Sequence, residues 1–126
     1  MRKIERPVNP EYLNCPIRNV IEKFGDKWSL LVLYHLHKNA TAGEPAMRFN
    51  ALHREMTDIS QKMLSQTLHR METIGLISRT LYPEVPPRVE YALTEMGQSL
   101  MPHIIALMDW SNEHLDRIAH AETAQE

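Results

Sequence analysis

The 126-residue sequence predicts a single, mainly α-helical domain with one small β-hairpin. Two observations carry this prediction. A pair of helical segments is separated by a short turn, Thr57 to Ile59, and two β-prone segments follow it at once. Two helices joined by such a turn form a helix-turn-helix, and a hairpin behind them forms a wing. The predicted fold is therefore a winged helix-turn-helix.

The second helix of the pair is bounded at both ends. Ser60 is a suitable N-cap, and Gly75 is a suitable residue just beyond the C-terminus. Leu64, Leu68 and Met71 recur at the spacing of one helix face, so we expect them to be buried. Polar side chains occupy the opposite face: Lys62, Ser65, Gln66 and His69.

The first helix of the pair and the wing complete the motif. Asn50 is a candidate N-cap for the first helix, on which Leu52 and Met56 lie four residues apart. Residues 76–82 and 88–93 are rich in strand-forming side chains. The prolines between them cannot donate ladder hydrogen bonds, so the segment 83–87 is expected to be an exposed, stiff hairpin tip.

Two more helices are expected before the motif. Pro16 follows Cys15 and opens a helix whose apolar residues continue to Phe24, before Gly25 ends it. Asp26 is a candidate N-cap for a helix over residues 27–37, which is apolar on too many sides to be a surface helix. We expect that helix to form the buried centre, followed by a loop over residues 38–47.

The remaining segments flank the motif. Residues 47–49 are a candidate short strand beside the wing. Thr94 is expected to cap a last helical region that reaches about Ile118, with a kink or break near Met101 caused by Pro102. The predicted organisation is an N-terminal arm over residues 1–14, the winged domain with its dimerisation helices over residues 15–118, and a disordered polar tail over residues 119–126.

Composition limits the class of protein. The formal net charge of −2 argues against a general nucleic-acid binder, and residues 48–90 hold six Lys or Arg against five Asp or Glu. One cysteine excludes an intramolecular disulfide framework and fits a reducing compartment. The N-terminus lacks an apolar signal region and no apolar run is long enough for a membrane span, so we expect a cytoplasmic protein without membrane association.

Catalytic and metal sites are not indicated. His35 and His37 point to different sides of a helix, and no Cys or carboxylate cluster completes a tetrahedral metal site. The sequence contains no nucleophile and base pair, phosphate loop or carboxylate pair at a usable spacing. We therefore expect no enzyme activity and no cofactor.

The polar face of the second helix is the candidate DNA-binding surface. A helix in the major groove reads bases with its N-terminal residues, and Gln61, Lys62, Ser65 and Gln66 occupy that position here. The alternative is an ordinary solvated helix face. The other candidate DNA contacts are Ser60 at the cap, His69 and Arg70 further along the helix, and Arg88 in the wing. Arg88 could equally pair with Glu84 or Glu90. Arg70 is expected to contact a phosphate or to form a local ion pair, and not to read bases.

Cys15 is the one residue with candidate redox chemistry. It precedes Pro16 at a predicted helix start, where backbone N–H groups and the helix dipole favour a thiolate. The alternative is an unreactive thiol, partly buried in a dimer interface.

Several motifs, in the same order along the chain, resemble one family. They are Cys15-Pro16, Phe24-Gly25-Asp26-Lys27-Trp28, Arg48-Phe49-Asn50-Ala51-Leu52, Ile59-Ser60-Gln61-Lys62-Met63-Leu64 and Tyr82-Pro83-Glu84-Val85-Pro86-Pro87-Arg88-Val89-Glu90-Tyr91. Together they resemble the HxlR-type winged helix-turn-helix transcription regulators of bacteria. The resemblance spans roughly Cys15 to Trp110. This chain differs in a longer loop over residues 38–47 and in His69, where relatives often carry Arg.

The resemblance implies a homodimer built from the first and last helices, with the second motif helix in the major groove and the wing on the flanking backbone or minor groove. Some relatives use an N-terminal cysteine at a comparable place to sense oxidants or electrophiles, which makes Cys15 a candidate sensor and leaves the unreactive alternative open. Independently, the apolar faces of the first and last helices exceed what one small core can cover, which favours a dimer.

The sequence thus favours a dimeric, sequence-specific transcriptional regulator, a repressor on a palindromic operator, with double-stranded DNA and a second copy as partners and a small molecule or oxidant as effector. The alternative is a winged-helix module for protein interaction or small-molecule binding without DNA.

Overall fold

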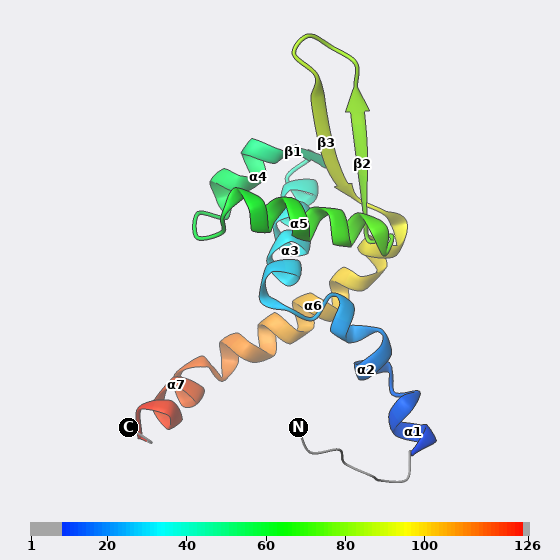
Figure 1. The fold of residues 1–126 in the computed structure, drawn as a ribbon. Coiled ribbons are helices and arrows are strands. Elements are labelled where there is room, and N and C mark those ends of the chain that lie inside the picture. The colour runs from blue at the N-terminus through cyan, green and yellow to red at the C-terminus, as the bar shows by residue number, and fades with distance from the viewer. Residues whose placement is uncertain (1–8, 125–126) are drawn as a thin grey trace.

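The helix-turn-helix lies across the middle of the structure, with the hairpin projecting from one side and the C-terminal helices leaving on the other (Figure 1). The computed structural model describes residues 9–124. The elements are α1 (Pro10–Leu13), α2 (Pro16–Asn19), the 3-10 helix η1 (Ile21–Lys23), α3 (Lys27–Thr41), β1 (Ala46–Arg48), α4 (Phe49–Glu55), α5 (Gln61–Thr73), β2 (Ile77–Tyr82), β3 (Arg88–Leu93), α6 (Glu95–Glu113) and α7 (Leu115–Ala124).

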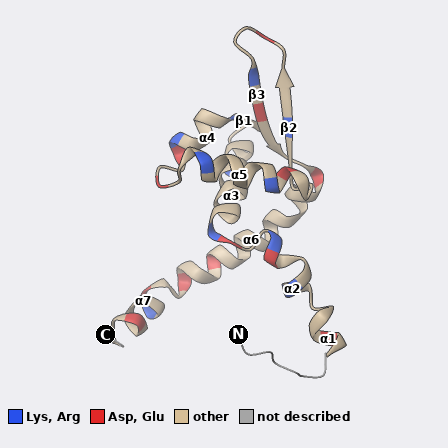
Figure 2. Ribbon diagram, in the orientation of Figure 1, with Lys and Arg blue, Asp and Glu red and all other residues tan. Residues whose placement is uncertain are grey.

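Charge is distributed unevenly between the two ends of the structure (Figure 2). From Glu95 to Ala124, helices α6 and α7 carry five Asp or Glu and one Arg, whereas residues 46–93 carry six Lys or Arg and five Asp or Glu. The negative net charge of the chain therefore resides mainly in the C-terminal helices. The half that holds the helix-turn-helix and the wing has a small positive balance, so the net charge says little about what that half binds.

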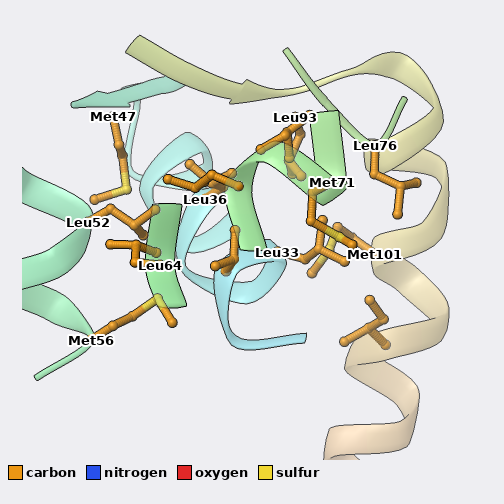
Figure 3. Close-up of a cluster of buried hydrophobic side chains, with 14 of the residues drawn as sticks. Leu33, Leu36, Met47, Leu52, Met56, Leu64, Met71, Leu76, Leu93 and Met101 are labelled. Carbon is orange, nitrogen blue, oxygen red and sulfur yellow. The ribbon is translucent and has the colours of Figure 1, made fainter. Parts of the chain in front are cut away.

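The core forms where α3 and α5 cross beneath the sheet (Figure 3). Leu33 and Leu36 of α3 are almost fully buried, as are Leu64 and Leu68 of α5. Each buried leucine contributes about 1.5–3 kcal/mol relative to an exposed one, so this contact fixes α5 on the domain. The prediction that α3 is the buried centre, and that one face of α5 packs inward, is confirmed.

Both ends of α5 are closed as the sequence predicts. The Ser60 hydroxyl accepts a hydrogen bond from the backbone N–H of Met63 at 3.1 Å. At the other end, Gly75 has a φ of +86°, and its N–H donates to the Glu72 carbonyl at 3.0 Å. The next N–H, that of Leu76, donates to the Met71 carbonyl, also at 3.0 Å. These two bonds form a Schellman motif, whose left-handed position favours glycine.

The predicted N-cap of α4, Asn50, is wrong by two residues. The helix begins at Phe49, so Arg48 is the N-cap, and Asn50 lies inside the first turn. The physical reason is that strand β1 ends at Arg48, and the chain passes directly from the strand into the helix. The following turn agrees with the prediction, and the ring Nε2–H of His53 donates to the Ile59 carbonyl at 2.8 Å to close it.

The wing is a three-stranded antiparallel sheet in the order β1-β3-β2. In this sheet Arg48 is paired with Glu90, and Tyr82 is paired with Arg88. The hairpin strands and the short strand beside them are confirmed, with the short strand shifted to Ala46–Arg48. The proline-rich tip between β2 and β3 is exposed, as expected.

The segments before the motif differ from the prediction in three ways. The single helix expected after Cys15 is divided into α2 and η1, because Val20 has a non-helical backbone between them. The expected arm contains α1, capped by the Asn9 side chain, and its first eight residues lie outside the described residues. The expected loop after residue 37 begins only at Ala42, because α3 continues to Thr41 and the Asn39 amide then donates to the Glu44 carbonyl at 2.7 Å.

The C-terminal helices also depart from the prediction. Thr94 caps α6 as expected, but the helix continues through Pro102 and ends at Glu113, so no break occurs near Met101. The break lies at His114, and α7 then extends to Ala124, which makes most of the expected disordered tail helical. A Cβ at Gly97 would overlap the carbonyl oxygen of Leu76, so this glycine allows α6 to pack against the start of the wing.

Candidate nucleic-acid interface

The outward face of α5 is fully available to solvent. Five polar side chains on this face are exposed: Gln61, Lys62, Ser65, Gln66 and His69. Within residues 9–124, none of these five side chains forms a hydrogen bond or ion pair with the rest of the chain. The opposite face of α5 is buried and consists of Leu64, Thr67, Leu68 and Met71. A helix that keeps its polar groups unpaired in this way can offer them to a ligand.

Met63 lies in the first turn of the same helix and is 38% exposed. An apolar side chain at this place suits contact with the methyl group of thymine, which lies in the major groove. Sequence reasoning missed Met63, because spacing alone did not show on which side of the buried stripe it falls.

Two of the predicted DNA-contacting residues of this region have structural roles. The Ser60 hydroxyl accepts the capping hydrogen bond of α5. The Arg70 guanidinium donates through Nη2 to both carboxylate oxygens of Asp26, at 3.1 and 3.2 Å, and to the Ser29 hydroxyl at 2.7 Å. Of the two alternatives for Arg70, the structure contains the local ion pair. This pair joins the recognition helix to the first turn of α3.

Asp26 is the centre of that connection. Its carboxylate caps α3 by accepting the Ser29 backbone N–H at 3.2 Å, and it also accepts the Ser29 hydroxyl at 2.6 Å. Partial burial on its own raises the pKa of Asp26, but the Ser29 hydrogen bonds and the charge of Arg70 outweigh it and hold this pKa below its ordinary value. The carboxylate is therefore charged at neutral pH, and it links α5 to the N-terminus of α3.

The wing arginine is held by its neighbours. Arg88 Nη2 lies 3.3 Å from a Glu84 oxygen, and Arg88 Nε lies 3.6 Å from a Glu90 oxygen. The guanidinium carbon also stands 4.1 Å from the centre of the Tyr82 ring. The side chain retains only 27% exposure. The alternative in which Arg88 pairs with Glu84 and Glu90 is therefore present in the structure.

A basic groove lies between α4 and the wing. Its cavity of about 440 Å³ is lined by Arg48, Phe49, Asn50, Ala51, Arg54, Pro87, Arg88 and Val89. Three of these residues are arginines and none is acidic. A groove of this charge and place suits a backbone phosphate. We call it the arginine groove.

Arg48 and Arg54 were not predicted as site residues. The signal that could have found Arg48 is the strand pairing, which places it opposite Glu90 and two positions from Arg88 along β3. The sequence suggested a short strand there but gave no register. Arg54 requires the actual path of α4, which spacing alone does not supply.

Cys15 is the N-cap residue of α2 and is partly exposed. Its predicted activation by a helix dipole has weaker support, because α2 spans four residues and the chain then leaves helical geometry at Val20. A single helical turn carries little of the dipole of a long helix.

Among residues 9–124, no three His, Cys, Asp or Glu side chains cluster closely enough to hold a metal ion. Within the same range, no helix is both long and apolar enough to cross a membrane.

A helix-turn-helix with an unpaired polar face, a wing and an arginine groove beside it define a winged helix-turn-helix protein of the DNA-binding class. Comparison with known proteins narrows this class. The family model for HxlR-like helix-turn-helix proteins matches residues 23–119, and the chain belongs to this family of transcriptional regulators.

Individual relatives agree with the family match. The chain is 44% identical over 100 residues to an HTH-type transcriptional regulator of Methanothermobacter thermautotrophicus, covering 79% of this chain and 71% of the relative. It is 36% identical over 115 residues to the HTH-type transcriptional regulator YdeP of Bacillus subtilis, covering 91% of this chain and 85% of the relative.

Among solved structures, the redox regulator HypR in its reduced form is similar, with a TM-score of 0.74 and 31% identity. The match covers 83% of this chain and 98% of that chain. The winged helix-turn-helix fold predicted from the sequence is thus confirmed by the structure and by these relatives.

Proposed function

We propose that this transcriptional regulator binds a palindromic DNA operator as a homodimer and represses transcription there. The observation that carries the proposal is the outward face of α5, where exposed, unpaired polar side chains stand beside the arginine groove. This combination supplies both base-reading groups and phosphate-binding groups. A winged helix used only for protein contacts has no need for either.

The base contacts are assigned to the first turns of α5. Lys62 can donate to guanine O6 and N7, whereas Gln61 and Gln66 can form paired hydrogen bonds with adenine. Ser65 can bond either kind of base, and the exposed Met63 suits a thymine methyl. His69 lies further from the N-terminus and is assigned to the edge of this contact.

The backbone contacts are assigned to the arginine groove. Arg48 and Arg54 form no ion pair with any residue in the described part of the chain, so a phosphate can approach them directly. Arg88 enters the same groove but is shared with Glu84 and Glu90. The groove therefore fixes the position of the wing on DNA, and it contributes little to the choice of sequence.

Dimerisation is supported by apolar side chains left exposed at both ends of the chain. Ile17 and Val20 are 67% and 55% exposed near the N-terminus, and Leu107, Trp110 and Leu115 are 56%, 53% and 60% exposed on α6 and α7. A two-fold dimer through these elements would cover them. It would also place two α5 helices about 34 Å apart, one turn of DNA, which requires a palindromic site.

We also propose that Cys15 makes DNA binding sensitive to oxidants. Its partial exposure near the N-terminal end supports this, and the structurally similar HypR is a redox regulator known in reduced and oxidized forms. Treatment with diamide should weaken operator binding, and Cys15→Ser should remove that response. An equal response in the variant would exclude Cys15 as the sensor.

The test of the main proposal is a gel shift with the DNA upstream of the gene for this protein and of its neighbours, combined with light scattering. We expect a dimer at micromolar concentration and a shifted band that resists non-specific competitor DNA. Each phosphate contact should add about −0.9 to the slope of log K against log salt concentration. A monomer, or a slope near zero, would contradict the proposal and favour a protein-interaction module.

A further inference from the structure

An open cavity of about 690 Å³ lies at the C-terminal end of the recognition helix, and it shares no lining residue with the arginine groove. Three parts of the chain form its walls: the segment from α2 to η1, the C-terminal end of α5 with the residues after it, and the first half of α6. Figure 1 shows these parts meeting where the N-terminal segment passes α6. We call this space the α5–α6 cavity.

The lining of the α5–α6 cavity is mainly apolar. Its apolar side chains come from every wall, and they are Val20, Phe24, Ile74, Leu76, Met96 and Leu100. Met96 is 51% exposed, so apolar surface is left uncovered at the mouth. A volume of this size and an apolar lining are typical of sites for small organic molecules.

The polar groups of the lining include a cationic side chain and no anionic one. Lys23 is the cationic residue and His103 is a titratable one, while Asn19, Thr73 and Ser99 supply neutral hydrogen-bonding groups. No Asp or Glu lines the cavity. In addition, Lys23 forms no ion pair within residues 9–124. An ammonium group beside an apolar cavity without a carboxylate favours an anionic ligand over a cationic one.

The cavity is also connected to the DNA-binding helix in two ways. Thr73 and Ile74 of its lining are the last residue and the C-cap of α5. Phe24 of the opposite wall lies two residues before Asp26, whose carboxylate binds Arg70 of α5. A molecule that fills the cavity therefore contacts both the end of the recognition helix and the segment that anchors its middle.

We propose that the α5–α6 cavity binds a small organic anion with an apolar, ring-sized body, held by Lys23, and that its occupancy changes operator affinity. The regulatory half of this proposal rests on the proposed DNA-binding function, and the binding half does not. The ligand class follows from volume, apolar lining and charge. Its effect on DNA follows from the two connections to α5, since a ligand shifts an equilibrium only through contacts that differ between two states.

The binding half is tested on the full chain with two fluorescent probes of similar shape. One is 8-anilinonaphthalene-1-sulfonate, which is anionic, and the other is N-phenyl-1-naphthylamine, which is neutral. We expect saturable binding of one probe molecule per chain. Lys23→Met should weaken the anionic probe about tenfold and leave the neutral probe unchanged. Lys38→Met is the matched control, because Lys38 is an exposed lysine on α3 outside the cavity.

A second pair of variants tests the location without removing charge. Ser99→Phe places a ring in the cavity and should exclude both probes, whereas Gln98→Phe places the same ring on the adjacent exposed position of α6 and should not. Circular dichroism establishes that each variant is folded. Equal effects of Lys23→Met and Lys38→Met, or of the two phenylalanine variants, would overturn the binding site. Loss of the dimer on saturation with the probe, seen by light scattering, would also overturn it, because the cavity would then belong to the subunit interface.

The regulatory half is tested by titrating labelled operator DNA with and without saturating 8-anilinonaphthalene-1-sulfonate. We expect operator affinity to change by about fivefold or more, and Ser99→Phe to remove this response to the probe. An unchanged affinity would overturn the regulatory half and leave the binding site in place. Failure of the protein to bind any operator would overturn the proposed function, and the probe titrations would still decide the cavity.

Discussion

The recognition helix and the wing present their basic side chains to DNA in opposite ways. On α5, Lys62 is exposed and unpaired within the described chain. In the wing, Arg88 is placed between Glu84 and Glu90 and over the Tyr82 ring. Both residues were expected from the sequence to touch DNA, but only the first is ready to do so.

This difference separates two contributions to binding. A free lysine gains its full interaction when it meets a guanine, whereas Arg88 must first give up its carboxylate partners. An exposed ion pair contributes about 0.2–1 kcal/mol, so the wing gains less from each phosphate contact than its charge suggests. We infer that α5 sets sequence choice and that Glu84 and Glu90 moderate how firmly the wing holds any DNA.

The largest expected effect comes from α5. Lys62→Ala or Gln66→Ala should each weaken operator binding by about 1–3 kcal/mol and relax the sequence requirement, because each change removes a base contact. Fluorescence anisotropy with operator and with unrelated DNA measures this. Thr123→Ala, at an exposed position near the end of α7, is the control. Equal weakening on both DNAs would show that α5 does not read sequence.

The next effect distinguishes the arginine groove from α5. Arg54→Ala should weaken binding to every DNA to a similar extent and should reduce the salt slope by about 1, since it removes one phosphate contact. Arg117→Ala on α7, far from the groove, is the charge-matched control. A change in sequence preference in Arg54→Ala, with an unchanged salt slope, would reverse the roles assigned to the groove and the helix.

The comparison of α5 with the wing also shows which parts of the site the sequence could predict. The polar face of α5 was predictable because its caps, its length and its buried stripe are all local features, and the structure confirms them at Ser60, Leu64 and Gly75. The state of Arg88 was not predictable. Its alternative partners, Glu84 and Glu90, could be named from the sequence, but which of them bind depends on the twist and register of the hairpin.

The fold shows the same limit in its errors. Asn50 was chosen as a cap for its residue type, yet the end of β1 at Arg48 fixes where α4 begins. Pro102 was expected to kink or break the last helix, but α6 continues past it without a break, with Met101 and Ile104 buried on either side. In both cases tertiary contacts outweigh a local preference, and such contacts are not visible in the order of residues.

A smaller effect tests the restraint on the wing directly. Glu90→Gln should strengthen binding to all DNA a few-fold, because it removes a negative charge beside the groove and releases Arg88. Combining it with Arg88→Ala should abolish most of that gain. Glu113→Gln at the end of α6 is the control for net charge. If Glu90→Gln and Glu113→Gln strengthened binding equally, the Arg88 restraint would have no role.

The smallest effect concerns Arg70 of α5, which, like Arg88, is held in an ion pair. Asp26→Asn keeps an oxygen that can cap α3 but removes the charge that binds Arg70, so the free energy of unfolding should fall by about 0.2–1 kcal/mol at neutral pH. Because the folded-state pKa of Asp26 is held below its ordinary value of 3.8, the wild-type advantage is present above that pH and is lost as pH falls below it. In urea unfolding between pH 7 and pH 3, the free energies of unfolding of the wild type and of Asp26→Asn should therefore converge at the acid end. The control Asp116→Asn on α7 should not lower the free energy of unfolding to a comparable extent at neutral pH. If Asp26→Asn remained less stable than the wild type in acid, packing, and not the charge on Asp26, would hold α5 to α3.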